Sequence, residues 1–184
     1  MNGGGESRPF QMTTLISDLM MGYMGGLAWT TPKGCFVEVG VYQGGSAKVL
    51  YSIAQKQGRE LFLYDTFKGM PFKGEFDTHD VGLFSDCCVD EIRWNFPKAC
   101  VVEGVFPQSH IDQKIDVPPV AFVHADADQY QTTLDICKTF SPMMVKGGMI
   151  LFDDYYCVPS CIKAVDEFFP DKQILPDGRA LVIF

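Results

Sequence analysis

The sequence is short of basic side chains. Fifteen Lys and Arg residues stand against 23 Asp and Glu residues, so the formal net charge at pH 7 is −8. Nucleic acids and anionic membrane surfaces attract proteins mainly through clustered positive charge. The composition therefore argues against a nucleic-acid or membrane partner, and it favours a small-molecule or neutral substrate.

A membrane span, a secretion signal and a cysteine-based metal motif are also missing. The apolar stretch 19–27 falls short of the roughly 20 residues that a transmembrane helix needs. The start Met-Asn-Gly-Gly-Gly-Glu-Ser lacks the basic residues of a signal peptide. The seven cysteines form no Cys-x-x-Cys pair, which favours reduced structural thiols over zinc ligands or a catalytic thiol. We expect a cytoplasmic protein.

The glycine loop at 37–46 lacks the Gly-x-Gly-x-x-Gly fingerprint, which argues against a nicotinamide dinucleotide. The loop nevertheless joins an expected strand to an expected helix, and its glycines Gly40, Gly44 and Gly45 allow a ligand to approach the backbone. Glu38, at the strand end, suits a cationic or hydroxylated group. A ligand site is one interpretation, and an ordinary tight turn is the alternative.

Apolar runs and helical segments alternate along the chain. We expect strands at 35–39, 61–64, 99–102, 120–125 and 149–152. We expect helices at 12–29, 46–57, 89–96, 132–140 and 160–169. Continuously apolar strands between helices predict a parallel sheet covered on both faces. Segments 172–175 and 180–184 flank a Pro-Asp-Gly turn, which predicts a terminal hairpin with one antiparallel strand. The chain thus reads as one α/β domain at 34–184, preceded by a tail and helix at 1–33.

Asp65 and the segment 66–84 that follows it indicate a ligand site at the carboxyl ends of the strands. Asp65 ends an expected strand 25 positions after Gly40, a distance at which an acid binds ribose hydroxyls in nucleotide-binding folds. A loop or helix cap is the alternative for Asp65. The long glycine-containing segment 66–84, which includes His79, is the candidate for a mobile loop on the substrate side.

Three aspartates, Asp126, Asp153 and Asp154, follow buried strands. The first two are 27 positions apart, about one strand, loop and helix, so their strands are expected to be neighbours. Buried carboxylates are costly unless they are neutralised, and a hard cation such as Mg²⁺ would do so. Asp126 is also a candidate base, and helix capping is the alternative. His124, on the same face as Asp126, is either a core histidine or a substrate contact.

Together these segments resemble the macrocin O-methyltransferase family, S-adenosylmethionine-dependent enzymes that methylate sugar hydroxyls on macrolide and aminocoumarin antibiotics. The resemblance runs from Gly34 to the end of the chain. It rests on the segments 37–46, 65–71 and 126–130, and on Gly147-Gly148 followed by Asp153-Asp154-Tyr155. The sequence departs from the family pattern at Gln43 and His124, where arginine is common, and at Ala127, where glycine is common.

The resemblance implies the Rossmann-like class I methyltransferase fold, with a mostly parallel seven-stranded sheet, one antiparallel strand and helices on both faces. It implies cofactor contacts by Glu38, Gly40, Gly44, Gly45, Ser46, Asp65, Thr66, Gly104, Val105, Phe106 and Asp126. It also implies that Asp126, Asp153 and Asp154 hold Mg²⁺ and that Asp126 is the base, with His124 as the alternative proton acceptor.

The functional hypothesis is an S-adenosylmethionine-dependent, Mg²⁺-assisted O-methyltransferase that acts on a small hydroxylated acceptor, with a sugar as one candidate. Two alternatives stay open: a catechol-type O-methyltransferase, and a non-catalytic subunit that binds S-adenosylmethionine. The sequence also leaves open whether the protein forms a homodimer.

Overall fold

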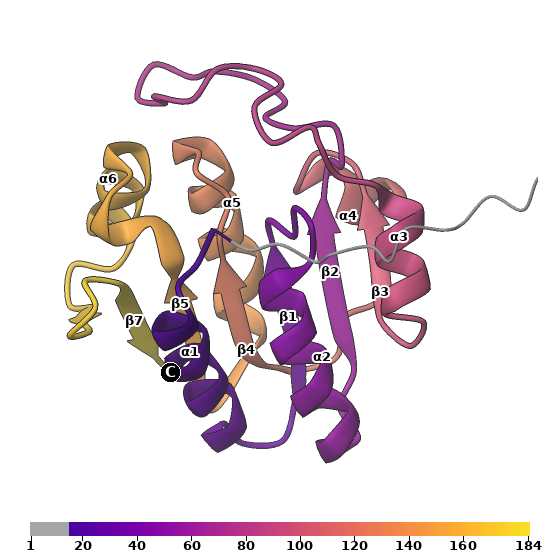
Figure 1. Cartoon of the computed structure of the whole chain (residues 1–184). Coiled ribbons are helices and arrows are strands. Elements are labelled where there is room, and N and C mark those ends of the chain that lie inside the picture. The colour runs from indigo at the N-terminus through magenta and orange to yellow at the C-terminus, as the bar shows by residue number, and fades with distance from the viewer. Residues whose placement is uncertain (1–14) are drawn as a thin grey trace, which may run out of the picture.

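A seven-stranded sheet forms the centre of the molecule (Figure 1). The computed structural model describes residues 15–184, so residues 12–14 of the expected first helix lie outside the described part. The strand order is β3-β2-β1-β4-β5-β7-β6. The strands are β1 (Cys35–Val39), β2 (Leu61–Asp65), β3 (Cys100–Glu103), β4 (Val120–Ala125), β5 (Met144–Phe152), β6 (Gln173–Ile174) and β7 (Ala180–Ile183).

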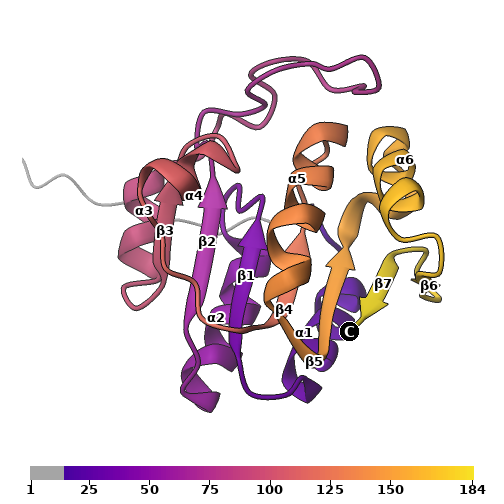
Figure 2. The same ribbon diagram turned by 180° about the vertical axis from the view of Figure 1, so that it is seen from behind.

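Helices cover both faces of this sheet. They are α1 (Asp18–Thr30), α2 (Gly45–Gln57), α3 (Val89–Asn95), α4 (Gln108–Asp112), α5 (Tyr130–Phe140) and α6 (Pro159–Phe168), with 3₁₀ turns η1 (Ser141–Met143) and η2 (Asp153–Tyr156). One apolar cluster joins the sheet to α1, α2 and α3. A second cluster joins the opposite face to α5 and α6, as the view from behind shows (Figure 2). No helix in the described part is long and apolar enough to cross a membrane.

Burial on both faces explains why the inner strands have few polar positions. All five residues of β1 are buried, and their side chains alternate between the two clusters, with Phe36 in one and Val37 in the other. The same alternation along β4 places His124 on the side of Glu38. An acid and a histidine inside such a sheet therefore need each other as partners.

The predicted fold is confirmed: the sheet is mostly parallel, and β7 runs antiparallel to β5. Three details differ from the expectation. The short helix α4 was not predicted, because five residues carry too little periodicity. Strand β5 begins at Met144, five residues earlier than expected, and α1 begins at Asp18, six residues later than the expected start at residue 12. Asp153 and Asp154 follow β5, as expected, and lie in η2.

Candidate active site

A cavity of about 350 Å³ opens at the carboxyl ends of β1, β2, β4 and β5. Its size falls in the range of about 300–1,000 Å³ that is typical of small-molecule sites. Most of the predicted cofactor residues line it, namely Gly40, Gly45, Ser46, Asp65, Thr66, Gly104, Val105, Phe106 and Asp126. Glu38 and Gly44 do not line it, because Glu38 is completely buried in the sheet and Gly44 faces the side chains of α3 and its neighbour Phe96.

The glycine loop brings the backbones of β1 and β4 together at the cavity. Gly40 has a φ of 95°, and a Cβ atom there would lie 1.6 Å from the carbonyl oxygen of Asp126. Only glycine fits this crossing. Helix α2 starts directly after the loop, and Gly44, its N-cap, has no side chain to cap it. The positive end of α2 is therefore open to a carboxylate from a ligand through Gly45 and Ser46.

Asp65 holds the glycine loop in place. Its Oδ2 atom accepts hydrogen bonds from the backbone N–H groups of Val41 at 2.7 Å and Tyr42 at 2.8 Å, and its Oδ1 atom accepts one from Phe67 at 2.7 Å. A carboxylate oxygen has room for a second donor, so Oδ1 retains acceptor capacity toward the cavity. Ribose binding by Asp65 stays a prediction, now joined by a structural role that the sequence reasoning missed.

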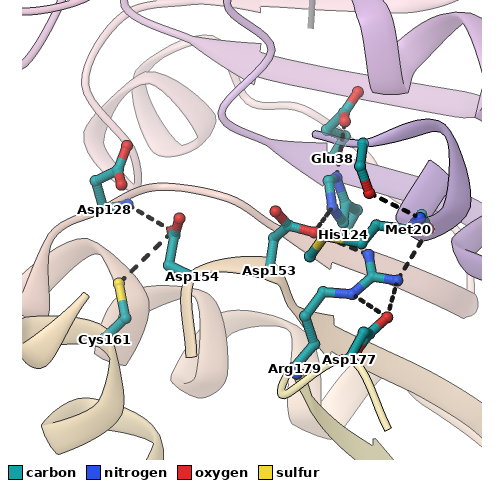
Figure 3. A network of polar contacts seen from close by, with 10 residues as sticks. Met20, Glu38, His124, Asp128, Asp153, Asp154, Cys161, Asp177 and Arg179 are labelled. Atoms are coloured by element: carbon teal, nitrogen blue, oxygen red, sulfur yellow. Dashed lines mark hydrogen bonds and ion pairs between the residues drawn. The ribbon is translucent and has the colours of Figure 1, made fainter. Parts of the chain in front are cut away.

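A chain of charged side chains runs beneath the cavity (Figure 3). His124 Nδ1 lies 2.8 Å from Glu38 Oε1, and His124 Nε2 lies 3.4 Å from Asp153 Oδ1. Asp153 Oδ1 also accepts a hydrogen bond of 2.9 Å from Arg179 Nη1. Glu38, His124 and Arg179 are completely buried. This network of charged side chains joins the predicted cofactor side of the sheet to the predicted metal side.

Arg179 lies at one end of this network of charged side chains. It was not predicted from the sequence. Its guanidinium donates to Asp153, to Asp177 through Nε at 3.0 Å and Nη2 at 2.7 Å, and to the carbonyl oxygen of Met20 at 2.9 Å. The contacts connect the carboxy-terminal hairpin to α1 across the end of β5. The one available signal was an arginine directly after the Asp177-Gly178 turn, at the start of an apolar strand.

The partners of each group set the direction of its pKa. Burial lowers the pKa of His124, but its hydrogen bonds to Asp153 and Glu38 outweigh burial and hold this pKa well above its usual value. Burial raises the pKa of Asp153, but the bonds from His124 and Arg179 leave that pKa below its usual value. With carboxylates facing both ring nitrogens, the raised pKa of His124 favours the imidazolium, which has no lone pair for a substrate proton. The geometry therefore does not favour His124 as a proton acceptor.

Asp126 and Asp154 are not neutralised in this way. Burial raises the pKa of Asp126 well above its usual value, and the charge of Asp153 adds to the effect. Burial also raises the pKa of Asp154, with a further contribution from Asp126. Both aspartates line the cavity. Uncompensated negative charge at the wall of a cavity is an environment that a hard divalent cation would stabilise.

Of the three predicted metal ligands, Asp126 and Asp153 lie close together with His124, whereas Asp154 makes contacts elsewhere. Ligand atoms of His124, Asp126 and Asp153 all lie within 4.8 Å of one another. Asp154 turns toward α5 and α6 instead, where its Oδ2 atom accepts hydrogen bonds from the backbone N–H of Asp128 at 3.0 Å and from the Cys161 thiol. The donor set fits a divalent cation through Asp126 and Asp153. The place of Asp154 in that set stays a prediction.

The comparisons with known proteins agree with this geometry. A family model described as Macrocin-O-methyltransferase matches residues 27–178. The chain is 28% identical over 153 residues to demethyldecarbamoylnovobiocin O-methyltransferase of Streptomyces niveus, an alignment that covers 73% of this chain and 58% of that protein. It is 26% identical over 151 residues to 8-demethyl-8-(2,3-dimethoxy-alpha-L-rhamnosyl)-tetracenomycin-C 4'-O-methyltransferase of Streptomyces olivaceus, again with 73% and 58% coverage. The chain therefore spans less than two thirds of the length of these relatives.

Two solved structures share the fold. The O-methyltransferase NovP superposes with a TM-score of 0.74 at 22% identity, covering 92% of this chain and 81% of that one. The calicheamicin methyltransferase CalS11 superposes with a TM-score of 0.70 at 19% identity, covering 90% and 77%. The family match spans most of the chain and includes Glu38, Asp65, His124, Asp126, Asp153 and Asp154. This protein belongs to the macrocin O-methyltransferase family.

Proposed function

We propose that the protein is an S-adenosylmethionine-dependent O-methyltransferase that transfers a methyl group to a hydroxyl of a sugar-like acceptor. One observation carries the proposal: a single cavity is lined by the glycine loop on one side and by the uncompensated carboxylates of Asp126 and Asp154 on the other. The names of the relatives support the acceptor class, since one of them is a methyltransferase of a rhamnosyl tetracenomycin.

The cofactor belongs in the half of the cavity next to β1 and β2. The positive end of α2 would hold the methionine carboxylate, Asp65 would accept hydrogen bonds from the ribose, and the segment 104–106 would contact the adenine. The Oε2 atom of Glu38 is buried without a hydrogen-bond partner among the described residues. A buried carboxylate oxygen without a partner favours a donor at the adjacent cavity floor, and the methionine ammonium would be such a donor if it reached Glu38.

The acceptor belongs in the half next to β4 and β5. Asp126 and Asp153, with Asp154 as the predicted third ligand, would hold a divalent cation there, and such a cation would supply Lewis-acid activation of the acceptor hydroxyl. The Asp126 carboxylate is the proposed acceptor of the hydroxyl proton, because it lines the cavity beside Asp153 and Asp154. His124 and Arg179 fix Asp153, so that the acceptor oxygen is oriented toward the methyl group by rigid neighbours.

Cofactor binding is the first test. Titration calorimetry with S-adenosylhomocysteine is expected to show binding to the protein, and Asp65→Asn is expected to weaken it by about 10-fold or more, because charge-assisted hydrogen bonds are worth about 1.5–3 kcal/mol. The control is Asp171→Asn, which makes the same chemical change at an exposed position. Absence of binding at millimolar S-adenosylhomocysteine, with and without Mg²⁺, would remove the proposal.

The acceptor class is the second test. With S-adenosylmethionine and Mg²⁺, methyl α-L-rhamnopyranoside is expected to be methylated faster than catechol, as measured by transfer of a labelled methyl group. Faster methylation of catechol would point to the catechol-type alternative. Binding of the cofactor without any transfer to either compound, or to a wider panel of glycosides, would favour a non-catalytic subunit.

A further inference from the structure

The loop at 66–84 rises above the carboxyl ends of the strands and extends across them toward α5, with many of its residues exposed (Figure 1). Its stem is closed by two backbone hydrogen bonds, from Met70 N–H to the Leu83 carbonyl and from Gly82 N–H to the Met70 carbonyl, each 2.9 Å long. The loop starts directly after the cofactor residue Asp65. Its far end reaches the segment that follows Asp126, so it bridges the two halves of the cavity.

Asp77 makes the central contact at that far end. Its Oδ1 atom accepts a hydrogen bond of 2.8 Å from the backbone N–H of Tyr130, the first residue of α5, 53 positions away. Its Oδ2 atom accepts one of 2.8 Å from Gly74 within the loop. In the described part of the chain, the side chain of Gln129, the N-cap residue of α5, makes no capping bond. The loop therefore supplies the carboxylate that α5 lacks, at the end of the helix that favours negative charge.

Contacts around Asp77 strengthen the docking. The side-chain amide of Gln129 donates to the carbonyl oxygen of Phe72. The rings of Phe76 and Tyr130 lie 4.9 Å apart, and Lys163 Nζ sits 4.7 Å from the centre of the Phe76 ring. Asp77 is only 7% exposed, which is unusual for an acid on a surface loop. Its burial is a consequence of the docking.

The docked loop forms part of the cavity wall. His79 Nε2 lies 3.3 Å from Asp128 Oδ1, and both residues line the cavity. Phe84, at the other end of the loop, also lines the cavity and packs edge-on against Tyr42 at 5.7 Å. The wall on the acceptor side thus depends on where the loop rests. The resting place depends in turn on the bond between Asp77 and α5.

We propose that Asp77 is a positioning residue that latches the loop 66–84 onto the N-terminus of α5 and thereby fixes the acceptor-side wall at His79. The latch makes the site selective for an acceptor small enough to lie beneath the loop, such as a monosaccharide. It acts through the loop and does not touch the reacting atoms. The acceptor part of this inference rests on the proposed function, whereas the latch itself does not.

Hydrogen exchange of the full chain tests the latch without any substrate. Asp77→Ala is expected to speed exchange at the Tyr130 amide and across residues 70–83 by at least about 10-fold. The variant lacks the charge-assisted hydrogen bond that holds the loop on α5, so the state in which the loop is detached becomes more populated. The matched control is Asp80→Ala, in the same loop, where the carboxylate is exposed and pairs with Lys73. Asp77→Asn keeps one oxygen acceptor and is expected to give an intermediate rate, which decides the question if the alanine variant does not fold.

Binding and kinetics separate an acceptor-side latch from a general structural role. In Asp77→Ala, the KM for methyl α-L-rhamnopyranoside is expected to rise about 10-fold, since the same bond is lost, whereas the Kd for S-adenosylhomocysteine stays within about threefold. Asp80→Ala is expected to change neither value.

Unchanged hydrogen-exchange rates in Asp77→Ala would contradict the proposal that Asp77 latches the loop onto α5. Faster exchange with an unchanged KM for the glycoside, or an equal loss of S-adenosylhomocysteine affinity, would overturn its acceptor-side role. A wild-type protein that binds S-adenosylhomocysteine but methylates no glycoside would contradict the proposed function, while the exchange rates would still decide the latch.

Discussion

Replacing Arg179 with methionine is expected to lower the free energy of unfolding by about 3–5 kcal/mol, the usual cost of removing one partner from a buried ion pair. Methionine fills a similar volume but leaves Asp153, which is 5% exposed, without its strongest donor. Asp177 loses two hydrogen bonds and the Met20 carbonyl loses one. Urea unfolding followed by circular dichroism measures the change directly.

Two further variants separate burial from charge. Arg93→Met removes a half-exposed arginine that pairs with Asp90 and Glu103, and it is expected to cost less than about 1 kcal/mol. Arg179→Lys keeps the charge but not the planar fork, so an intermediate loss is expected. Equal decreases in the free energy of unfolding for Arg179→Met and Arg93→Met would contradict the inference that the buried contacts of Arg179 stabilise the fold.

The position of the site was predictable because strand ends follow from local pattern. The spacing between Asp126 and Asp153 predicted neighbouring strands, and the structure confirms this, since Ala125 and Phe152 are register partners in β4 and β5. The same logic located Asp65 at the end of β2. Continuous apolar runs in short strands are set by burial on both faces, so a sequence shows them without reference to distant residues.

The choice of partner for each acid was not predictable, because it depends on contacts between distant segments. Asp153 meets Arg179, 26 positions later, only because β7 pairs with β5. Asp77 meets Tyr130 only because the loop folds across the sheet. No pattern of neighbouring residues in the sequence predicts either contact.

The separation of Asp153 from Asp154 has a local cause that the sequence also concealed. Both residues were expected to follow the strand 149–152 with their carboxylates close to that of Asp126, and they lie in the 3₁₀ turn η2. Successive residues of such a turn are rotated by about 120°. Asp153 therefore points to the side of His124, and Asp154 points toward Cys161 on the other face of the site (Figure 3).

Replacing Asp126 with asparagine is expected to reduce methyl transfer by about 100-fold or more, the range attributed to a positioned general base. The carboxylate lies at the boundary between the two halves of the cavity and belongs to the one group of His, Asp, Glu and Cys side chains in the described chain whose ligand atoms lie within 4.8 Å. Asparagine preserves shape but can neither accept the hydroxyl proton nor bind a cation as an anion. Transfer of a labelled methyl group to methyl α-L-rhamnopyranoside measures the loss, with Asp116→Asn at an exposed position as the control.

The stability of the Asp126→Asn variant decides how such a loss is interpreted. Burial and the charge of Asp153 raise the pKa of Asp126, so ionisation of this group disfavours the folded state as the pH rises through that pKa. A neutral amide removes the penalty. In metal-free buffer near pH 8, the variant is therefore expected to unfold at the same urea concentration as the wild type or at a higher one, and to bind S-adenosylhomocysteine with a Kd within about threefold, because the amide removes no hydrogen bond to the cofactor. A variant that loses both turnover and stability would contradict the assignment of Asp126 as an uncompensated charge, and full activity would remove its role as base.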